Sequence, residues 1–183
     1  MLNPKIKLWG IIIMDIETIT GSFSGVITID RQNNVVTKRF KPDVCARWGL
    51  YNRELFWLQK LSSFNRTPNL ISYDEDSLYI KMEYMGEKIT KDNIPDDWKK
   101  QCKFIINKLQ KYKCSHNDIK PTEILVLDGK INIIDFGWST ALGKKIPSDW
   151  PTEIGGGFKL SEHKFDDYRA LTSSIKCFIK DEQ

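Results

Sequence analysis

The chain has 183 residues, of which 40% are hydrophobic and 28% are charged, and its net charge is +4 at pH 7. This length suffices for one ordinary domain or for two small lobes with a buried core. The charge is mild and scattered, so we expect a globular protein without a nucleic-acid partner.

The cysteines and the apolar N-terminal run bear on the compartment in which the protein works. The four cysteines have no paired spacing, and with only two histidines they indicate no zinc site. The apolar run 8–14 is far shorter than the roughly 20 residues that span a bilayer, and it is typical of a buried strand. We therefore expect a cytoplasmic protein with reduced thiols and no membrane partner. The cysteines are Cys45, Cys102, Cys114 and Cys177.

Two alternating runs near the N-terminus predict a β-hairpin. Residues 26–30 and 35–40 flank Asn33-Asn34, a pair typical of a tight turn. Lys38 lies on the second run and shares its face with apolar neighbours, although a lysine in a strand is usually exposed.

A helix is predicted next, from about Ala46 to Leu61. Glu54 lies in the middle of its apolar stripe, where a charge is costly unless it is paired. A lysine from a neighbouring strand is the natural partner, and the alternative is a Glu54 that reaches solvent at the edge of the stripe. The stripe repeats at spacings of three and four and consists of Leu50, Tyr51, Trp57, Leu58 and Leu61.

Two further strands and a second helix follow. Residues 70–73 and 78–84 are typical of strands, and the acidic stretch 74–76 joins them. The pattern from Asn93 to Tyr112 predicts a helix that supports the core. Its apolar face consists of Trp98, Cys102, Ile105, Ile106 and Leu109.

The stretch 116–137 gathers charged side chains around a second predicted hairpin. Residues 124–127 and 130–134 flank Asp128-Gly129, the strongest short signal for a two-residue turn. The register places Asp135 opposite Thr122, but whether Glu123 faces Asp135 stays open. Oxygen ligands around a lysine suit Mg²⁺ and phosphate. The residues beyond the open end of the hairpin are Asp118, Lys120, Glu123 and Asp135.

The same stretch resembles the protein kinase family. HNDIKPTEIL is similar to the family's catalytic loop, HRDxKxxN, at His116, Asp118 and Lys120. Asp135-Phe136-Gly137 is similar to the metal-binding DFG. The sequence departs from the family at Asn117, where an arginine is usual, and at Glu123, where a metal-binding asparagine is usual.

Upstream segments extend the resemblance. Residues 20–26 resemble a reduced phosphate-covering loop in which only Gly21 aligns, and an ordinary turn is the alternative. VVTK, ending at Lys38, is similar to the family's VAIK, and the resemblance implies that Glu54 is the helix glutamate that pairs with this lysine. Residues 82–86 resemble the hinge whose backbone bonds adenine, and a plain edge strand followed by a loop is the alternative.

The resemblance implies roles for ten residues and binding of ATP with Mg²⁺, or Mn²⁺ in its place. Asp118 would be the base that accepts the substrate's hydroxyl proton, and Lys120 would contact the γ-phosphate. Asp135 and Glu123 would bind the metal. The implied ATP-binding residues are Gly21, Ser22, Lys38, Glu54, Glu83 and Met85.

Two segments follow the DFG. Residues 138–164 lack clear periodicity and are interpreted as a flexible or extended activation segment. Residues 166–171 resemble the start of a helix whose aspartate, Asp167, braces the backbone of the catalytic loop.

These features together imply an α+β, bilobal protein-kinase-like fold. Residues 1–83 would form an N-lobe with a small antiparallel sheet and one helix at about 46–61. Residues 84–183 would form a truncated, mainly helical C-lobe with the catalytic loop, the DFG and a short final helix. The implied activity is that of a minimal Ser/Thr protein kinase. A pseudokinase that binds a nucleotide or a protein, and a kinase for a small molecule with a hydroxyl group, are the alternatives.

Overall fold

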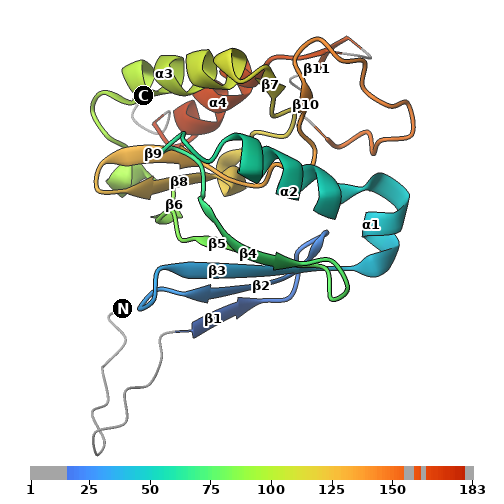
Figure 1. Ribbon diagram of the computed structural model, residues 1–183. Coiled ribbons are helices and arrows are strands. Elements are labelled where there is room, and N and C mark those ends of the chain that lie inside the picture. The colour runs from blue at the N-terminus through green and yellow to red at the C-terminus, as the bar shows by residue number, and fades with distance from the viewer. Residues whose placement is uncertain (1–15, 155–158, 162–163, 180–183) are drawn as a thin grey trace, which may run out of the picture.

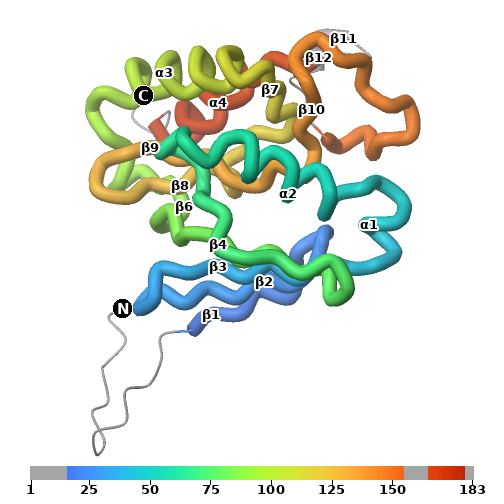
Figure 2. Tube along the Cα trace, viewed as in Figure 1, coloured from blue at the N-terminus to red at the C-terminus, as the bar shows by residue number. Residues whose placement is uncertain are grey.

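The computed structural model describes residues 16–154, 159–161 and 164–179. The fold is α+β, with a five-stranded antiparallel sheet and four α-helices in these residues (Figure 1). Figure 2 shows the sheet in the lower part of the view and the later elements above it. The arrangement confirms the expected α+β class and is compatible with two small lobes.

The large sheet is built from two hairpins and one added strand. Its order is β1-β2-β3-β5-β4, and every neighbouring pair is antiparallel. Asn34 and Leu78 have positive φ, which lets the chain reverse tightly within the β2–β3 and β4–β5 connections. The hairpin expected at 26–40 and the two strands expected at 70–73 and 78–84 are therefore confirmed. The strands are β1 (Ile16–Ile19), β2 (Gly25–Asp30), β3 (Val35–Phe40), β4 (Leu70–Asp74) and β5 (Tyr79–Glu83).

Two helices, α1 (Pro42–Trp48) and α2 (Leu50–Lys60), stand where a single helix at about 46–61 was expected. Gly49 ends α1 with φ of 64°, and its N–H donates to the Cys45 carbonyl at 2.7 Å. Glycine adopts this left-handed conformation without the strain that a Cβ would bring, so the chain changes direction there. The prediction of one helix was wrong because it followed the spacing of apolar residues, and this spacing does not show that Gly49 ends a helix.

The rest of the described chain holds two α-helices and seven short strands, so strands take a larger share of it than expected. Helix α3 begins at Trp98 rather than near Asn93, because a 3₁₀ turn and Pro95 precede it. All five residues of its expected apolar face are buried. The short elements are β6 (Glu87–Lys88), η1 (Lys91–Asn93), β7 (Cys114–Ser115), η2 (Pro121–Glu123), β10 (Thr140–Ala141), β11 (Lys159–Ser161) and β12 (Lys164–Phe165). The longer ones are α3 (Trp98–Lys111), β8 (Ile124–Leu127), β9 (Lys130–Ile133) and α4 (Asp167–Lys176).

The β8–β9 hairpin has the register that the sequence predicted. Asp128 and Gly129 form its turn with φ of 50° and 69°, the pair of positive values that a type I′ turn requires. The Ile134 N–H donates to the Glu123 carbonyl at 3.1 Å, which extends the register one pair beyond the strands. The open end of the hairpin therefore brings Glu123 and Asp135 together in the backbone.

A continuous apolar core joins the hairpin to α2, α3 and α4. Gln101 of α3 ties the helix to the hairpin, because its amide donates to the Gly129 carbonyl and accepts the Ile131 N–H, both at 2.9 Å. Phe136 and Ile119, which flank the candidate site in sequence, are fully buried. The core therefore holds the segments that carry the charged residues in fixed positions.

Several other expectations concern the ends of the chain, the cysteines and the membrane. The buried strand expected at 8–14 lies outside the described residues. The late helix is present as α4, and the described part of the segment 138–164 contains only short strands, namely β10, β11 and the start of β12. All four cysteines are free. Across the described residues, no helix is both long enough and apolar enough to cross a membrane.

Candidate functional site

Lys38 on β3 is a buried lysine held between two carboxylates. Its Nζ lies 2.6 Å from Oε2 of Glu54 and 2.9 Å from Oδ1 of Asp135. Lys38 and Glu54 are 4% and 1% exposed, so water contributes little to their solvation. The ion pair expected between Lys38 and Glu54 is present, and Asp135 from a distant part of the chain joins it.

Lys38, Glu54 and Asp135 form a triad in which the charge of each residue depends on the other two. Burial lowers the pKa of Lys38, but the negative charges of Asp135 and Glu54 outweigh burial and hold its pKa above the usual range. Burial raises the pKa of Asp135, but the Lys38 charge outweighs it and the net pKa is lowered. Burial raises the pKa of Glu54 to about 7 against the attraction of Lys38. Lys38 and Asp135 are therefore charged at neutral pH.

Asp118 and Lys120 lie at the open end of the β8–β9 hairpin. The Lys120 Nζ donates to Oδ2 of Asp118 at 2.7 Å and lies 3.5 Å from Oε1 of Glu123. Asp118 and Glu123 are buried, whereas the Lys120 side chain is about half exposed. The lysine therefore neutralises two buried carboxylates while it keeps contact with solvent.

Asp167 of α4 fixes the backbone that precedes Asp118. Its Oδ2 accepts the His116 N–H at 2.7 Å, and its Oδ1 accepts the Asn117 N–H at 2.9 Å. These two bonds hold Asn117 in a left-handed conformation with φ of 69°. The bracing expected of Asp167 is therefore confirmed.

Asp135 is positioned by its backbone conformation and by its neighbours. Its φ is 63°, in the left-handed region that aspartate adopts more readily than most non-glycine residues. The buried Phe136 ring packs against the His116 ring, with 4.9 Å between centroids, and the His116 Nε2 bonds the Ile134 carbonyl at 3.0 Å. The Gly137 N–H donates to Oδ1 of Asp135 at 3.4 Å. These contacts turn the Asp135 carboxylate toward Lys38.

The loop 20–24 contains Gly21 and Ser22, two of the residues expected to bind ATP. A Cβ on Gly21 would have nothing within 4 Å, so the loop is open there. Ser22 shares a hydrogen bond of 3.3 Å with Ser24, and its carbonyl accepts from Lys41 at 3.2 Å. No hydrogen bond in the described residues joins either Gly21 or Ser22 to Lys38 or Asp135, so the structure does not bring the loop into the triad.

Glu83 and Met85 lie where the large sheet leads into the second half of the chain. The Glu83 N–H donates to the Asn69 carbonyl at 2.9 Å, and its carboxylate accepts the Asn69 amide at 2.8 Å. The Met85 carbonyl accepts the Asn132 amide at 2.9 Å. These bonds fix the backbone of the connecting segment beside the buried Met82.

Asp135 and Glu123 are the carboxylates that could hold a divalent cation. Burial raises the pKa of Glu123 to about 7, and the negative charge of Asp135 adds to this effect. A cation near both groups would relieve their repulsion. In the described residues, no group of three or more His, Cys, Asp or Glu side chains could hold a metal alone. Mg²⁺ commonly uses one or two carboxylates with substrate phosphates and water, so this pair fits Mg²⁺.

Two positioning residues were not predicted from the sequence. The Asn117 amide donates to the Trp138 carbonyl at 2.8 Å and to Oγ1 of Thr140 at 3.1 Å, which ties the loop to the segment after Gly137. The Arg53 guanidinium donates to the Gly137 carbonyl at 2.9 Å and to the Trp48 carbonyl at 3.0 Å. The sequence feature that could have drawn attention to Arg53 is its position next to Glu54 in the helix.

Comparisons with known proteins add no assignment to this geometry. The sequence matches no protein-family model, and it matches no curated protein.

Proposed function

We propose that the protein is an ATP- and Mg²⁺-dependent phosphotransferase with a bilobal, protein-kinase-like fold, and that it transfers the γ-phosphate to a serine or threonine hydroxyl. The observation that carries the proposal is the contact of Lys38 with both Glu54 and Asp135. Burying a lysine between carboxylates carries a desolvation cost, and such clusters of charges are enriched at functional sites. Asp118 and Lys120 lie at the same open end of the hairpin as Asp135 and supply further groups for phosphate chemistry.

The residues would divide the work between binding and proton transfer. The ammonium groups of Lys38 and Lys120 would bind the phosphates, and Glu54 would hold Lys38 in place. A bound Mg²⁺ would neutralise phosphate charge, with Asp135 and Glu123 as its protein ligands. The backbone of Glu83 and Met85 would bond adenine. Asp118 would accept the proton of the attacking hydroxyl while the new O–P bond forms and the bond to the β-phosphate oxygen breaks.

Rigid support of these groups favours phosphoryl transfer. Such transfer depends mainly on positioning and on charge stabilisation, with little covalent chemistry for the protein. Asp167 bonds the backbone just before Asp118, and Asn117 and Arg53 bond the backbone just after Asp135.

The free cysteines support a reducing, cytoplasmic place of action.

A pseudokinase is the second candidate, and Glu123 is the observation that favours it. The Glu123 carboxylate lies 3.5 Å from Lys120, so it competes with phosphate for that ammonium. A protein of this kind would bind nucleotide without transferring phosphate. A kinase for a small molecule would use the same groups and would differ only in the acceptor.

The test measures binding and transfer separately. Thermal unfolding of the full chain with ATP, with and without Mg²⁺ or Mn²⁺, reports nucleotide binding. Transfer of labelled phosphate to the chain itself, to a generic protein and to small hydroxyl compounds reports catalysis. We expect a metal-dependent rise in Tm and transfer by the wild-type protein.

The Asp118→Asn variant tests the assignment of the base. It should reduce transfer by about 10²- to 10⁴-fold while nucleotide binding persists. Asp128→Asn is the matched control, because Asp128 is exposed at the turn of the hairpin and has a positive φ that asparagine tolerates. Unimpaired transfer by Asp118→Asn would refute the assignment, and binding without any transfer would favour the pseudokinase.

A further inference from the structure

Helix α3 concentrates positive charge that the total charge of the chain conceals. Between Asp97 and Asp118 there is no acidic residue. The whole chain has 28 basic and 24 acidic residues, so without the six lysines of this stretch 22 basic residues would face 24 acidic ones. The net positive charge of the protein therefore comes from this stretch alone. The six are Lys99, Lys100, Lys103, Lys108, Lys111 and Lys113.

These lysines are available to a partner. Five of them are exposed and Lys108 is partly exposed. In the part of the chain that the structure describes, none of the six lysines forms an ion pair. Their charges are therefore directed to solvent, where they attract anions.

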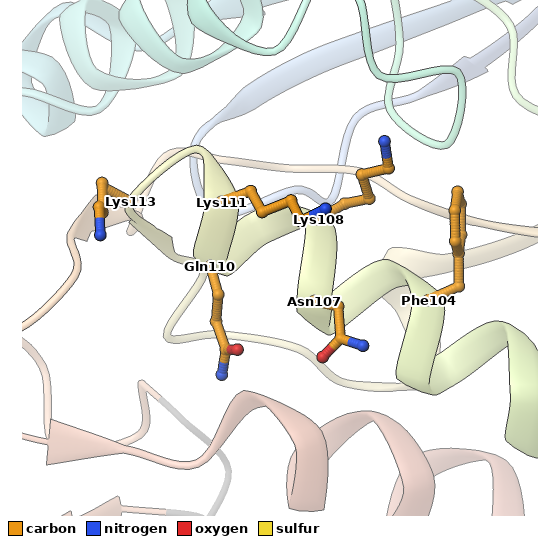
Figure 3. A pocket seen from close by; sticks show the side chains of 6 residues that line it. All are labelled: Phe104, Asn107, Lys108, Gln110, Lys111 and Lys113. Carbon is orange, nitrogen blue, oxygen red and sulfur yellow. The ribbon is translucent and has the colours of Figure 1, made fainter.

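An aromatic ring and two amides lie among the lysines at the C-terminal half of α3. Phe104 is 41% exposed, and the cationic groups of Lys108 and Arg66 lie 5.7 and 5.9 Å from its ring centre. Figure 3 shows Phe104 and Lys108 pointing to one side of the helix and Asn107 and Gln110 to the other. Together with Lys111 and Lys113, these side chains line a depression of about 500 Å³.

We propose that the lysine-rich surface around the exposed Phe104 at the C-terminal half of α3 binds single-stranded nucleic acid. We refer to this surface as the lysine face. The lysines would contact phosphates, and the exposed Phe104 ring would stack on a base, the combination by which proteins bind single strands without sequence preference. The proposal departs from the expectation of no nucleic-acid partner, because that expectation used the total charge. It is independent of phosphotransferase activity.

The composition of the lysine face distinguishes nucleic acid from other polyanions. Protein interfaces are poor in lysine and have an apolar centre, whereas this face has one exposed apolar side chain among lysines. A membrane-bound helix inserts an apolar face, but the apolar face of α3 is buried in the core. Charge complementarity and a stacking ring therefore favour a single strand.

The test is fluorescence anisotropy of the full chain with a labelled oligo(dT) of about 20 nucleotides and an oligo(U) of the same length. Affinity is measured between about 50 and 200 mM salt, because the slope counts phosphate contacts at about 0.7 each. Reversing three charges should weaken binding at least tenfold and reduce the slope by about 2. The variant is Lys108→Glu, Lys111→Glu and Lys113→Glu combined.

A second triple variant serves as the control: three exposed basic residues outside α3 are replaced by glutamate, which changes the net charge of the protein by the same amount. This control should weaken binding less than about threefold. Phe104→Ala should weaken binding about fivefold or more without changing the salt slope. Equal effects of the two triple variants would overturn the proposal, as would no binding near 50 mM salt. Equally tight binding of poly-glutamate or of anionic vesicles would also overturn it. The control combines Arg39→Glu, Lys88→Glu and Lys145→Glu.

Discussion

Replacing Lys38 by methionine should destabilise the protein more than replacing Glu54 by glutamine, because Lys38 has two carboxylate partners. At 2.6 and 2.9 Å, each carboxylate attracts the ammonium by about 6 kcal/mol at an effective dielectric constant of 20. Desolvation of the ions offsets much of this attraction, at several kcal/mol per ion. Lys38→Met leaves the buried Glu54 carboxylate and the partly exposed Asp135 carboxylate without this counter-charge, which should lower the free energy of unfolding by about 3–5 kcal/mol.

Glu54→Gln should cost less, about 1–3 kcal/mol, because Lys38 keeps Asp135 and the amide oxygen still accepts a hydrogen bond. Urea unfolding of the full chain, followed by tryptophan fluorescence, measures both variants and their combination. The double variant should be more stable than the sum of the single effects predicts, by at least about 1 kcal/mol.

Arg31 provides the matched control, since it also pairs with two carboxylates, Glu17 and Glu87, at 2.6 and 2.7 Å, but near the surface. Arg31→Met should cost no more than about 1 kcal/mol. Additive effects of Lys38 and Glu54 to within about 0.5 kcal/mol would refute the reasoning, because contacting charges do not act independently. A loss at Arg31 as large as that at Lys38 would refute the role given to burial.

Three further predictions address the backbone and the metal ligands. Asp167→Asn leaves one of two backbone N–H groups facing an amide donor, so thermal unfolding should show a loss of about 1–3 kcal/mol. Gly25→Ala should cost at least about 2 kcal/mol in urea unfolding, because its Cβ would lie 1.9 Å from a carbonyl oxygen of the facing strand, whereas Gly21→Ala, with nothing within 4 Å, should change stability little. Glu123→Asn removes a negative charge beside the proposed nucleotide site, so calorimetry should show ATP binding in chelator that is tighter than in the wild type; unchanged weak binding would show that Glu123 does not repel the nucleotide.

Local signals explain which parts of the fold were predictable. The β8–β9 register follows from Asp128-Gly129, because a two-residue turn of that type fixes which residues face each other. The need of Glu54 for a cationic partner followed from its place in an apolar stripe, and the family resemblance named Lys38 as that partner. The register and the need for a partner could each be inferred from a few neighbouring residues.

The parts that were missed depend on tertiary packing. The helix boundary at Gly49 depends on the left-handed backbone conformation of that residue, which the spacing of apolar residues in α2 does not indicate. The bonds of Asn117 to Trp138 and Thr140 join loops that come together only after the core has formed. No pattern along the chain marks such partners, so the departure from the usual arginine at Asn117 could be noted but not explained.

The candidate site is assembled from contacts that are very distant along the chain. Lys38 and Asp135 are 97 residues apart, and Arg53 and the Gly137 carbonyl are 84 residues apart. Closing loops of this length is entropically unfavourable until the intervening elements have formed, so these contacts should appear late on the folding pathway. Partly folded chains could then keep their helices and hairpins while lacking the arrangement around Lys38. Circular dichroism would count such partly folded chains as folded, because it reports secondary structure. The number of nucleotide-binding sites per chain would count only the fully folded molecules.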